Sequence, residues 1–280
     1  MTADNAEENV TRGDVATYAK TPSIHDRSEP PFGELPLVTM PAVWERELAD
    51  GVRLLGIEYD EVPLVQFEIV IDGGSALEPV AQKGVADLLA RLMNEGTALK
   101  SAAEFEAAVG LLGSDISVNA YTEEIVISGT ALAENFEETV ALAMEVLAGP
   151  RFADAEFERV KTAALTDITG REANPNSIAS LAFFKLIYGA DHPYGMPQSG
   201  TAQTVGNLTL EDVKAHYADL FDMATVIHVA GDIDPARAQA AFAGIAAEFS
   251  GSGERLPAYD VPAQAKGGNV YRLDGPGSKQ

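Results

Sequence analysis

The chain has 280 residues, of which 46% are hydrophobic and 22% charged, and it contains no cysteine. This composition suits one large folded domain or two modest ones and excludes a wholly disordered or fibrous protein. The lack of cysteine excludes disulfides and thiolate metal sites. Acidic residues outnumber basic residues by 43 to 19, which gives a formal net charge of -24. Such a charge repels phosphate backbones and anionic lipid, so we expect neither nucleic acid nor a membrane as a partner.

Residues 1–42 are polar, contain five prolines and show little periodicity. This stretch is predicted to be an extended N-terminal arm or linker, with plain disorder as the alternative. The acidic start lacks the features of a signal peptide, and no segment has the roughly 18 consecutive apolar residues of a membrane span. We therefore expect a soluble protein. Its compartment stays open between the cytoplasm and the bacterial periplasm, because a signal could lie elsewhere in a longer protein.

Beyond the arm, periodicity and turn residues predict three strands, two helices, two strands, and then mostly helices with one late strand. Asp50-Gly51 between two strand-like runs predicts a hairpin, and Ser101 with Glu104 predicts a capping box. The predicted strands cover residues 44–48, 52–59, 64–71, 115–121, 124–130 and 224–229. The predicted helices cover residues 83–94, 101–110, 134–148, 154–171, 178–188, 209–220 and 234–249.

This grouping predicts an α+β domain over residues 43–249, with helices packed on one face of a mainly antiparallel sheet. Residues 250–268 are interpreted as a polar linker, and residues 269–273 as one further strand. We interpret 269–280 as the start of a truncated second subdomain, because a strand at the chain end has no obvious partner. An end of this kind would favour self-association.

The four histidines form no metal-binding motif, because no pair has the spacing of HxxH, HExxH or HxxEH. His25 lies in the arm. His216, on a predicted helix, and His228, in a buried-looking strand, are interpreted as structural. His192 is the better functional candidate because it lies in a Gly- and Pro-rich loop.

The segment from Gly84 to Thr97 resembles the signature helix of the pitrilysin/insulinase-type zinc peptidases, family M16. Active members of that family carry HxxEH on this helix, followed by Gly-Thr. The likeness continues in order through residues 119–122, 157–159, 192–195, 208–213 and 229–233. It spans about residues 43–280 and implies the fold of such a peptidase.

The catalytic residues of the family do not carry over to this sequence. Asp87 and Arg91 stand at the positions of the two zinc-binding histidines. Ala90 stands at the position of the catalytic glutamate, Asp167 at that of the carboxylate ligand, and Val160 at that of a supporting glutamate. An arginine repels zinc, and an alanine cannot act as a base. We therefore expect no catalytic residue, no bound metal, loss of the ancestral zinc, and no activity of this chain alone.

Asp87 and Arg91 lie one helical turn apart with the acid first, which favours an ion pair. If the fold holds, Asp167 points to the same place. We hypothesise that Arg91 bridges the two carboxylates in place of the metal. The alternative is that Asp87 and Arg91 are ordinary solvated charges.

The resemblance implies a non-catalytic half that forms chamber wall and docking surface for an active HxxEH half, in the same longer protein or in a separate subunit. The matching strand pairs with extended peptides in active halves. Its residues here are Ser117, Val118, Asn119, Ala120 and Tyr121. A plain sheet edge is the alternative for this strand. Two other functions stay open: a structural scaffold subunit, and a zinc endopeptidase active through displaced ligands.

Overall fold

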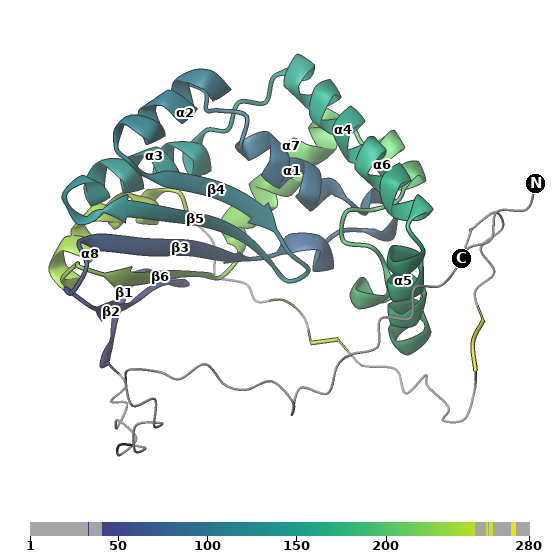
Figure 1. Ribbon diagram of the computed structural model, residues 1–280. Helices are drawn as coiled ribbons and strands as arrows, with labels where there is room; N and C mark the ends of the chain where they lie inside the picture. Colours follow the sequence, from purple (N-terminus) through teal and green to yellow (C-terminus); the bar gives the residue numbers. More distant parts are fainter. Residues whose placement is uncertain (1–32, 34–40, 250–255, 257, 260–269, 273–280) are drawn as a thin grey trace, which may run out of the picture. The chain divides into compact units, whose positions relative to one another are not determined.

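Figure 1 presents the computed structural model of the chain, which describes residues 33, 41–249, 256, 258–259 and 270–272. The predicted hairpin begins the sheet: β1 (Val43–Ala49) and β2 (Val52–Glu58) pair antiparallel around the Asp50-Gly51 turn. The other strands are β3 (Leu64–Asp72), β4 (Asp115–Ala120), β5 (Glu124–Leu132) and β6 (Thr225–Gly231). All six predicted strands of the domain are therefore present.

The six strands form one sheet in the order β1-β2-β6-β3-β5-β4. Four neighbouring pairs are antiparallel, and β2 with β6 is parallel. The sheet is mainly antiparallel, as predicted. The late strand β6 inserts between β2 and β3, a long-range pairing that sequence spacing does not reveal.

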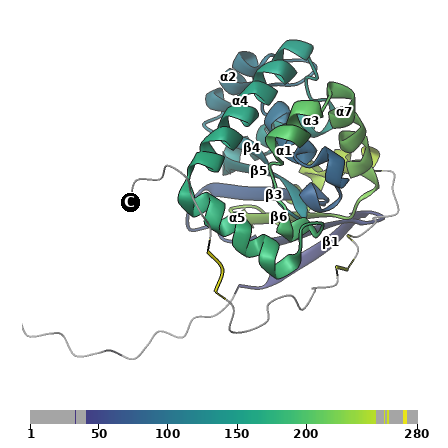
Figure 2. The ribbon, with the colours of Figure 1, turned by 90° about the vertical axis from the view of Figure 1, so that its right-hand side faces the viewer.

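Helices cover one face of the sheet, as Figure 2 shows from the side. They are α1 (Val85–Met93), α2 (Ala102–Leu111), α3 (Phe136–Ala148), α4 (Asp154–Ala173), α5 (Pro175–Tyr188), α6 (Ala202–Asn207), α7 (Leu210–Asp219) and α8 (Pro235–Ala241). The predicted capping box of Ser101 and Glu104 starts α2, and Thr209 with Asp212 forms a second one at α7. No helix in the described part of the chain is long and apolar enough to cross a membrane.

The core lies between the sheet and the helices. Alternate residues of β3 face it, so that Phe67 and Ile69 are buried while Gln66 and Glu68 are exposed on the opposite face. The Phe67 ring packs edge-on against Phe136 and Phe242. This alternation is the period-2 pattern of a strand with one buried face.

Two helix predictions need correction. The helix expected over 234–249 ends at Ala241 and continues only as a short 3-10 segment, Ala243–Ala247. The short helix α6, in the segment left unassigned before Thr209, was not predicted. It depends on a capping box formed by Thr201 and Thr204.

The arm predicted over 1–42 and the linker predicted over 250–268 lie mostly outside the described residues and stay predictions. Of the predicted strand 269–273, Val270, Tyr271 and Arg272 are described, and these three are not in a strand. A strand needs a neighbouring strand for its backbone hydrogen bonds, and the six strands of the described sheet do not include these residues.

Candidate functional site

Helix α1 begins at a buried ion pair. Glu78 accepts hydrogen bonds from the backbone amides of Gly84 (3.1 Å) and Ala86 (2.7 Å), at the positive end of the helix. Lys83 Nζ lies 3.7 Å from the Glu78 carboxylate and donates to the Ser75 carbonyl. Glu78 is 6% exposed and Lys83 2%. This pair fixes the start of the helix that carries Asp87 and Arg91.

Burial changes the pKa of both residues of this pair. Burial raises the pKa of Glu78 to about 7, although the hydrogen bonds from Ala86 and Gly84 and the charge of Lys83 act in the opposite direction. Burial also lowers the pKa of Lys83, although Glu78 opposes the change. Neither residue was singled out from the sequence, because a lysine next to a helix start is usually exposed.

Arg91 bridges two carboxylates on different helices, as hypothesised. Its Nε donates to Asp87 Oδ2 at 2.8 Å, and its Nη1 donates to Asp167 Oδ2 at 2.9 Å. The Asp167 side chain comes from α4, which packs against α1. Burial by itself would lower the pKa of Arg91, but Asp87 and Asp167 outweigh it and raise the pKa above its ordinary value. The guanidinium is therefore permanently charged.

The residues at this position do not fit a zinc ion. Arg91 presents a cation where a ligand would be needed, and its contacts already engage both carboxylates. Ala90 is 3% exposed and packs in the core, and Val160 on α4 is buried at 4%. In the described ranges, no group of three or more histidine and carboxylate side chains is arranged to hold a metal.

The predicted peptide-binding strand is an edge of the sheet. Among the described strands, β4 pairs only with β5. Ser117 to Ala120 belong to β4, whereas Tyr121 lies just past its end. An edge strand presents unpaired backbone groups, which is what an added peptide strand requires.

Two side chains of this protein already occupy part of that edge. Asn94, the residue that ends α1, donates to the Val118 carbonyl at 2.8 Å and accepts from the Val118 amide at 3.0 Å. Gln198 Nε2 donates to the Ala120 carbonyl. Because outward-facing residues alternate along a strand, Val118 and Ala120 are the positions that a peptide would use. No sequence pattern predicts these contacts, because they join distant segments.

A groove of about 510 Å³ lies along the same edge. Its apolar lining includes Phe105 and Val109 of α2, together with Ile116 of β4. Carboxylates at its rim come from Glu95, Glu106 and Asp115. Figure 1 places α2 and β4 side by side. The groove therefore combines an apolar lining with carboxylates.

The structure places three of the four histidines, and His25 lies outside the described residues. His216 on α7 is buried, and its Nε2 has no hydrogen-bond partner in the described part of the chain. Burial lowers the pKa of His216 to about 4, so it is a neutral structural residue. His192 accepts from the Tyr194 amide through Nδ1 at 3.1 Å.

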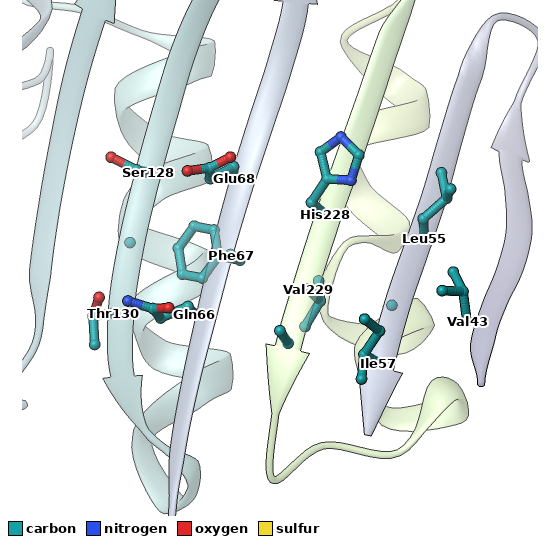
Figure 3. Close-up of a pocket in the computed structure, with 13 residues that line it drawn as sticks. Val43, Leu55, Ile57, Gln66, Phe67, Glu68, Ser128, Thr130, His228 and Val229 are labelled. Carbon is teal, nitrogen blue, oxygen red and sulfur yellow. The ribbon is translucent and has the colours of Figure 1, made fainter. Parts of the chain in front are cut away.

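His228 is exposed, and the prediction of a buried position is wrong. Ile227 and Val229 point into the core, so His228 between them points to the open face. It lines a pocket of about 550 Å³ on that face. Figure 3 shows it with Glu68 on the adjacent strand β3 and Ser128 on β5, the next strand beyond. Period-2 alternation could have revealed this exposure.

Comparison with known proteins gives one family. The model of the insulinase peptidases, family M16, matches residues 57–189. A non-peptidase homologue, YmxG, of Helicobacter pylori is 26% identical over 170 residues, which make up 61% of this chain and 39% of the relative. An uncharacterised zinc protease of Rickettsia bellii is 25% identical over 67% of this chain and 46% of its own length.

The solved structures include an M16 inactive domain from Pseudomonas fluorescens. It is 28% identical with a TM-score of 0.72, and the match covers 80% of this chain and 54% of that one. The chain thus spans between 39% and 54% of the length of these relatives. The α+β architecture is that of the inactive domain.

Proposed function

We propose that this chain, which matches the model of the insulinase peptidases over residues 57–189, is a member of family M16 and works as the non-catalytic half of a two-half M16 peptidase. In this proposal it supplies chamber wall and docking surface, and an active half that carries HxxEH supplies the zinc and the chemistry. In this proposal the active half belongs either to the same longer protein or to a separate subunit.

The observation that carries the proposal is the contact of Arg91 with Asp87 and Asp167. A permanent cation at the position of a zinc ligand opposes metal binding, and Ala90 offers no group that could accept a proton from water. We infer that Arg91 replaces the metal as the electrostatic link between α1 and α4, and that the ancestral zinc is lost. The names of YmxG and of the Pseudomonas domain, a non-peptidase and an inactive domain, support this inference.

Peptide contact at β4 is the finer part of the proposal. The edge position of β4 and the groove beside it support such contact. The acidic rim of the groove favours a basic peptide. A peptide strand can pair with Val118 only after Asn94 turns away, so we expect weak binding in the resting protein.

A scaffold role is the second candidate, and the Asn94 contact favours it. An edge closed by the protein's own side chains fits a subunit that does not handle peptide. Under this alternative, the chain stabilises a larger assembly and leaves substrate contacts to other subunits. The two roles differ in whether the chain alters the cleavage of peptide by an active half.

The deciding experiment measures zinc content and peptide cleavage for the chain alone, for an HxxEH-bearing M16 chain encoded beside it, and for their mixture. A half that takes part in proteolysis should contain no stoichiometric zinc and cleave nothing alone, yet raise the activity of the partner. A mixture in which the partner's glutamate is replaced by glutamine is the control for contaminating proteases.

Complex formation without any change in cleavage would favour the scaffold role. Stoichiometric zinc together with cleavage by this chain alone would overturn both roles and favour displaced ligands. In that case the Arg91→Ala variant should retain both zinc and activity.

A further inference from the structure

A further cavity, distinct from the groove beside β4 and from the pocket beside His228, is lined mainly by aromatic rings. It has a volume of about 430 Å³, and its ring residues are Tyr188 at the end of α5, His192 and Tyr194 in the following loop, and Tyr259. Glu123 completes the polar lining, and Leu256 and Ala258 complete the apolar lining. No lysine or arginine is among these residues.

Three of the rings form a tilted platform rather than a linear stack. The ring centroids of Tyr188 and His192 are 5.1 Å apart, those of Tyr188 and Tyr194 are 5.4 Å apart, and those of His192 and Tyr194 are 5.7 Å apart. A linear stack would place two of the rings at roughly twice the spacing of neighbours. Tyr259 stands edge-on to His192, with an interplanar angle of 63°. The cavity therefore has an aromatic floor and an aromatic wall.

A carboxylate is held at the same cavity. The Tyr194 hydroxyl donates to Glu123 Oε1, from the turn between β4 and β5. This hydrogen bond raises the pKa of Tyr194 to about 12, so the phenol stays neutral and keeps Glu123 in place. Tyr259 is fixed in turn by donating to the Ala76 carbonyl at 2.9 Å.

A buried donor of His192 also belongs to this cluster. Its Nδ1 accepts a hydrogen bond from the Tyr194 amide, so in the neutral ring the proton is on Nε2. That Nε2 is buried and has no hydrogen-bond partner in the described part of the chain. The imidazole adds its ring face to the platform.

We propose that this aromatic pocket binds a compact organic cation, with the charge over the rings of Tyr188, His192 and Tyr194 and paired with Glu123. Aromatic faces attract ammonium and guanidinium groups, and a nearby carboxylate adds to the attraction. The net charge of -24 favours the approach of a cation over long distances. The same chemistry is offered by a free quaternary ammonium compound and by a lysine or arginine side chain of a polypeptide. The proposal does not depend on the role of the chain as a non-catalytic half.

The test is an NMR titration of the chain with choline and with its uncharged isostere, 3,3-dimethyl-1-butanol. Choline should bind at least fivefold more tightly than the alcohol, because only choline carries the charge. Titrations with N-acetyl-lysine methylamide and N-acetyl-arginine methylamide then separate a free ammonium ligand from a side chain of a polypeptide.

Two variants locate the site. Glu123→Gln keeps an acceptor for Tyr194 and removes the charge, and Tyr188→Leu removes one ring of the platform. Each should weaken choline binding about fivefold. Glu61→Gln is the matched control, because Glu61 also accepts from a tyrosine hydroxyl, that of Tyr59 at 2.6 Å, but outside the pocket. It should leave binding unchanged.

Circular dichroism and the dispersion of the NMR spectrum establish that each variant is folded. Equal binding of choline and the alcohol, or no binding of any of the cations, would overturn the proposal. So would choline binding that neither Glu123→Gln nor Tyr188→Leu weakens.

Discussion

The side-chain amide of Asn94 makes both backbone hydrogen bonds of Val118 on the edge strand, one at 2.8 Å and the other at 3.0 Å. An asparagine amide has the same donor and acceptor as a peptide group, so Asn94 acts as one residue of a missing neighbouring strand. It stands at the end of α1, one turn beyond the Arg91 bridge. The helix that carries Arg91 therefore also supplies the side chain that closes the edge of the sheet at Val118.

Replacement of Asn94 by alanine should open the edge of the sheet. We expect the free energy of unfolding to fall by about 1–3 kcal/mol, because two partly buried hydrogen bonds to Val118 are lost. Amide exchange of Val118, followed by NMR, should become at least tenfold faster. If β4 handles peptides, extended basic peptides should bind more tightly to the variant.

Asn119→Ala is the control for this prediction. Asn119 lies on the same strand but is exposed, and its amide donates to the Ser117 hydroxyl at 3.4 Å. Its replacement should change neither exchange at Val118 nor peptide binding. Unchanged exchange in Asn94→Ala would contradict the role of Asn94 as an edge cap.

Replacement of Arg91 by methionine should destabilise the contact between α1 and α4. Arg91 is 35% exposed in its side chain, so solvent screens its two ion pairs, and we expect a loss of about 1 kcal/mol. Urea denaturation at low salt measures the loss, which should shrink in 1 M salt.

Asp167→Asn tests one arm of the bridge, the ion pair between Arg91 and Asp167. It removes only the more exposed arm, because Asp167 is 63% exposed against 21% for Asp87. Its loss should therefore be smaller than that of Arg91→Met. Equal stability of Arg91→Met and the parent chain at low salt would argue that the bridge adds nothing to folding.

Replacement of Lys83 by methionine should leave the Glu78 carboxylate buried without a cation. The expected loss is about 3–5 kcal/mol at pH 8, as for other broken buried pairs. The pKa of Glu78 is already raised to about 7, and removal of the lysine charge raises it further. The carboxyl of the variant is therefore protonated at pH 6, and the loss of stability is smaller there. Denaturation at both pH values measures the difference.

The double variant Glu78→Gln, Lys83→Met is the control for this pair. Its glutamine removes the buried charge but has one carbonyl oxygen, so it can accept from only one of the Gly84 and Ala86 amides that now bond the two oxygens of Glu78. It should recover part of the lost stability. A loss in Lys83→Met that is the same at pH 6 and pH 8 would contradict the assignment of a buried carboxylate.

His216 should make the chain sensitive to acid. Its pKa is lowered by burial from 6.5 to about 4, so the neutral form is favoured in the folded state. The resulting stability is present above pH 6.5 and is lost as the pH falls through 4, to a total of about 3 kcal/mol. His216→Leu should show a shallower fall in stability over this range.

The exposed His228 provides the comparison for His216. His228→Gln removes a histidine from the open face of the sheet and leaves His216 buried, so the fall in stability assigned to His216 should remain. If the free energy of unfolding of His216→Leu and of the parent chain fell equally with pH, protonation of His216 would not contribute to the acid sensitivity.

Local spacing in the sequence determined the strands, the hairpin turn and the capping boxes, because the backbone geometry of each depends on a few neighbouring residues. The loss of HxxEH also followed from the sequence, because Asp87, Ala90 and Arg91 replace residue types that the chemistry requires. The pairing of Asp87 with Arg91 followed from the pitch of a helix.

Only the tertiary structure decided which distant segments meet. It inserted β6 between β2 and β3 and brought Asn94 to Val118. It also buried Lys83 and His216 and assembled the aromatic pocket from α5, a loop and Tyr259. Such contacts depend on how the elements pack together in the core. The periodicity of one segment does not predict which other segment it will contact.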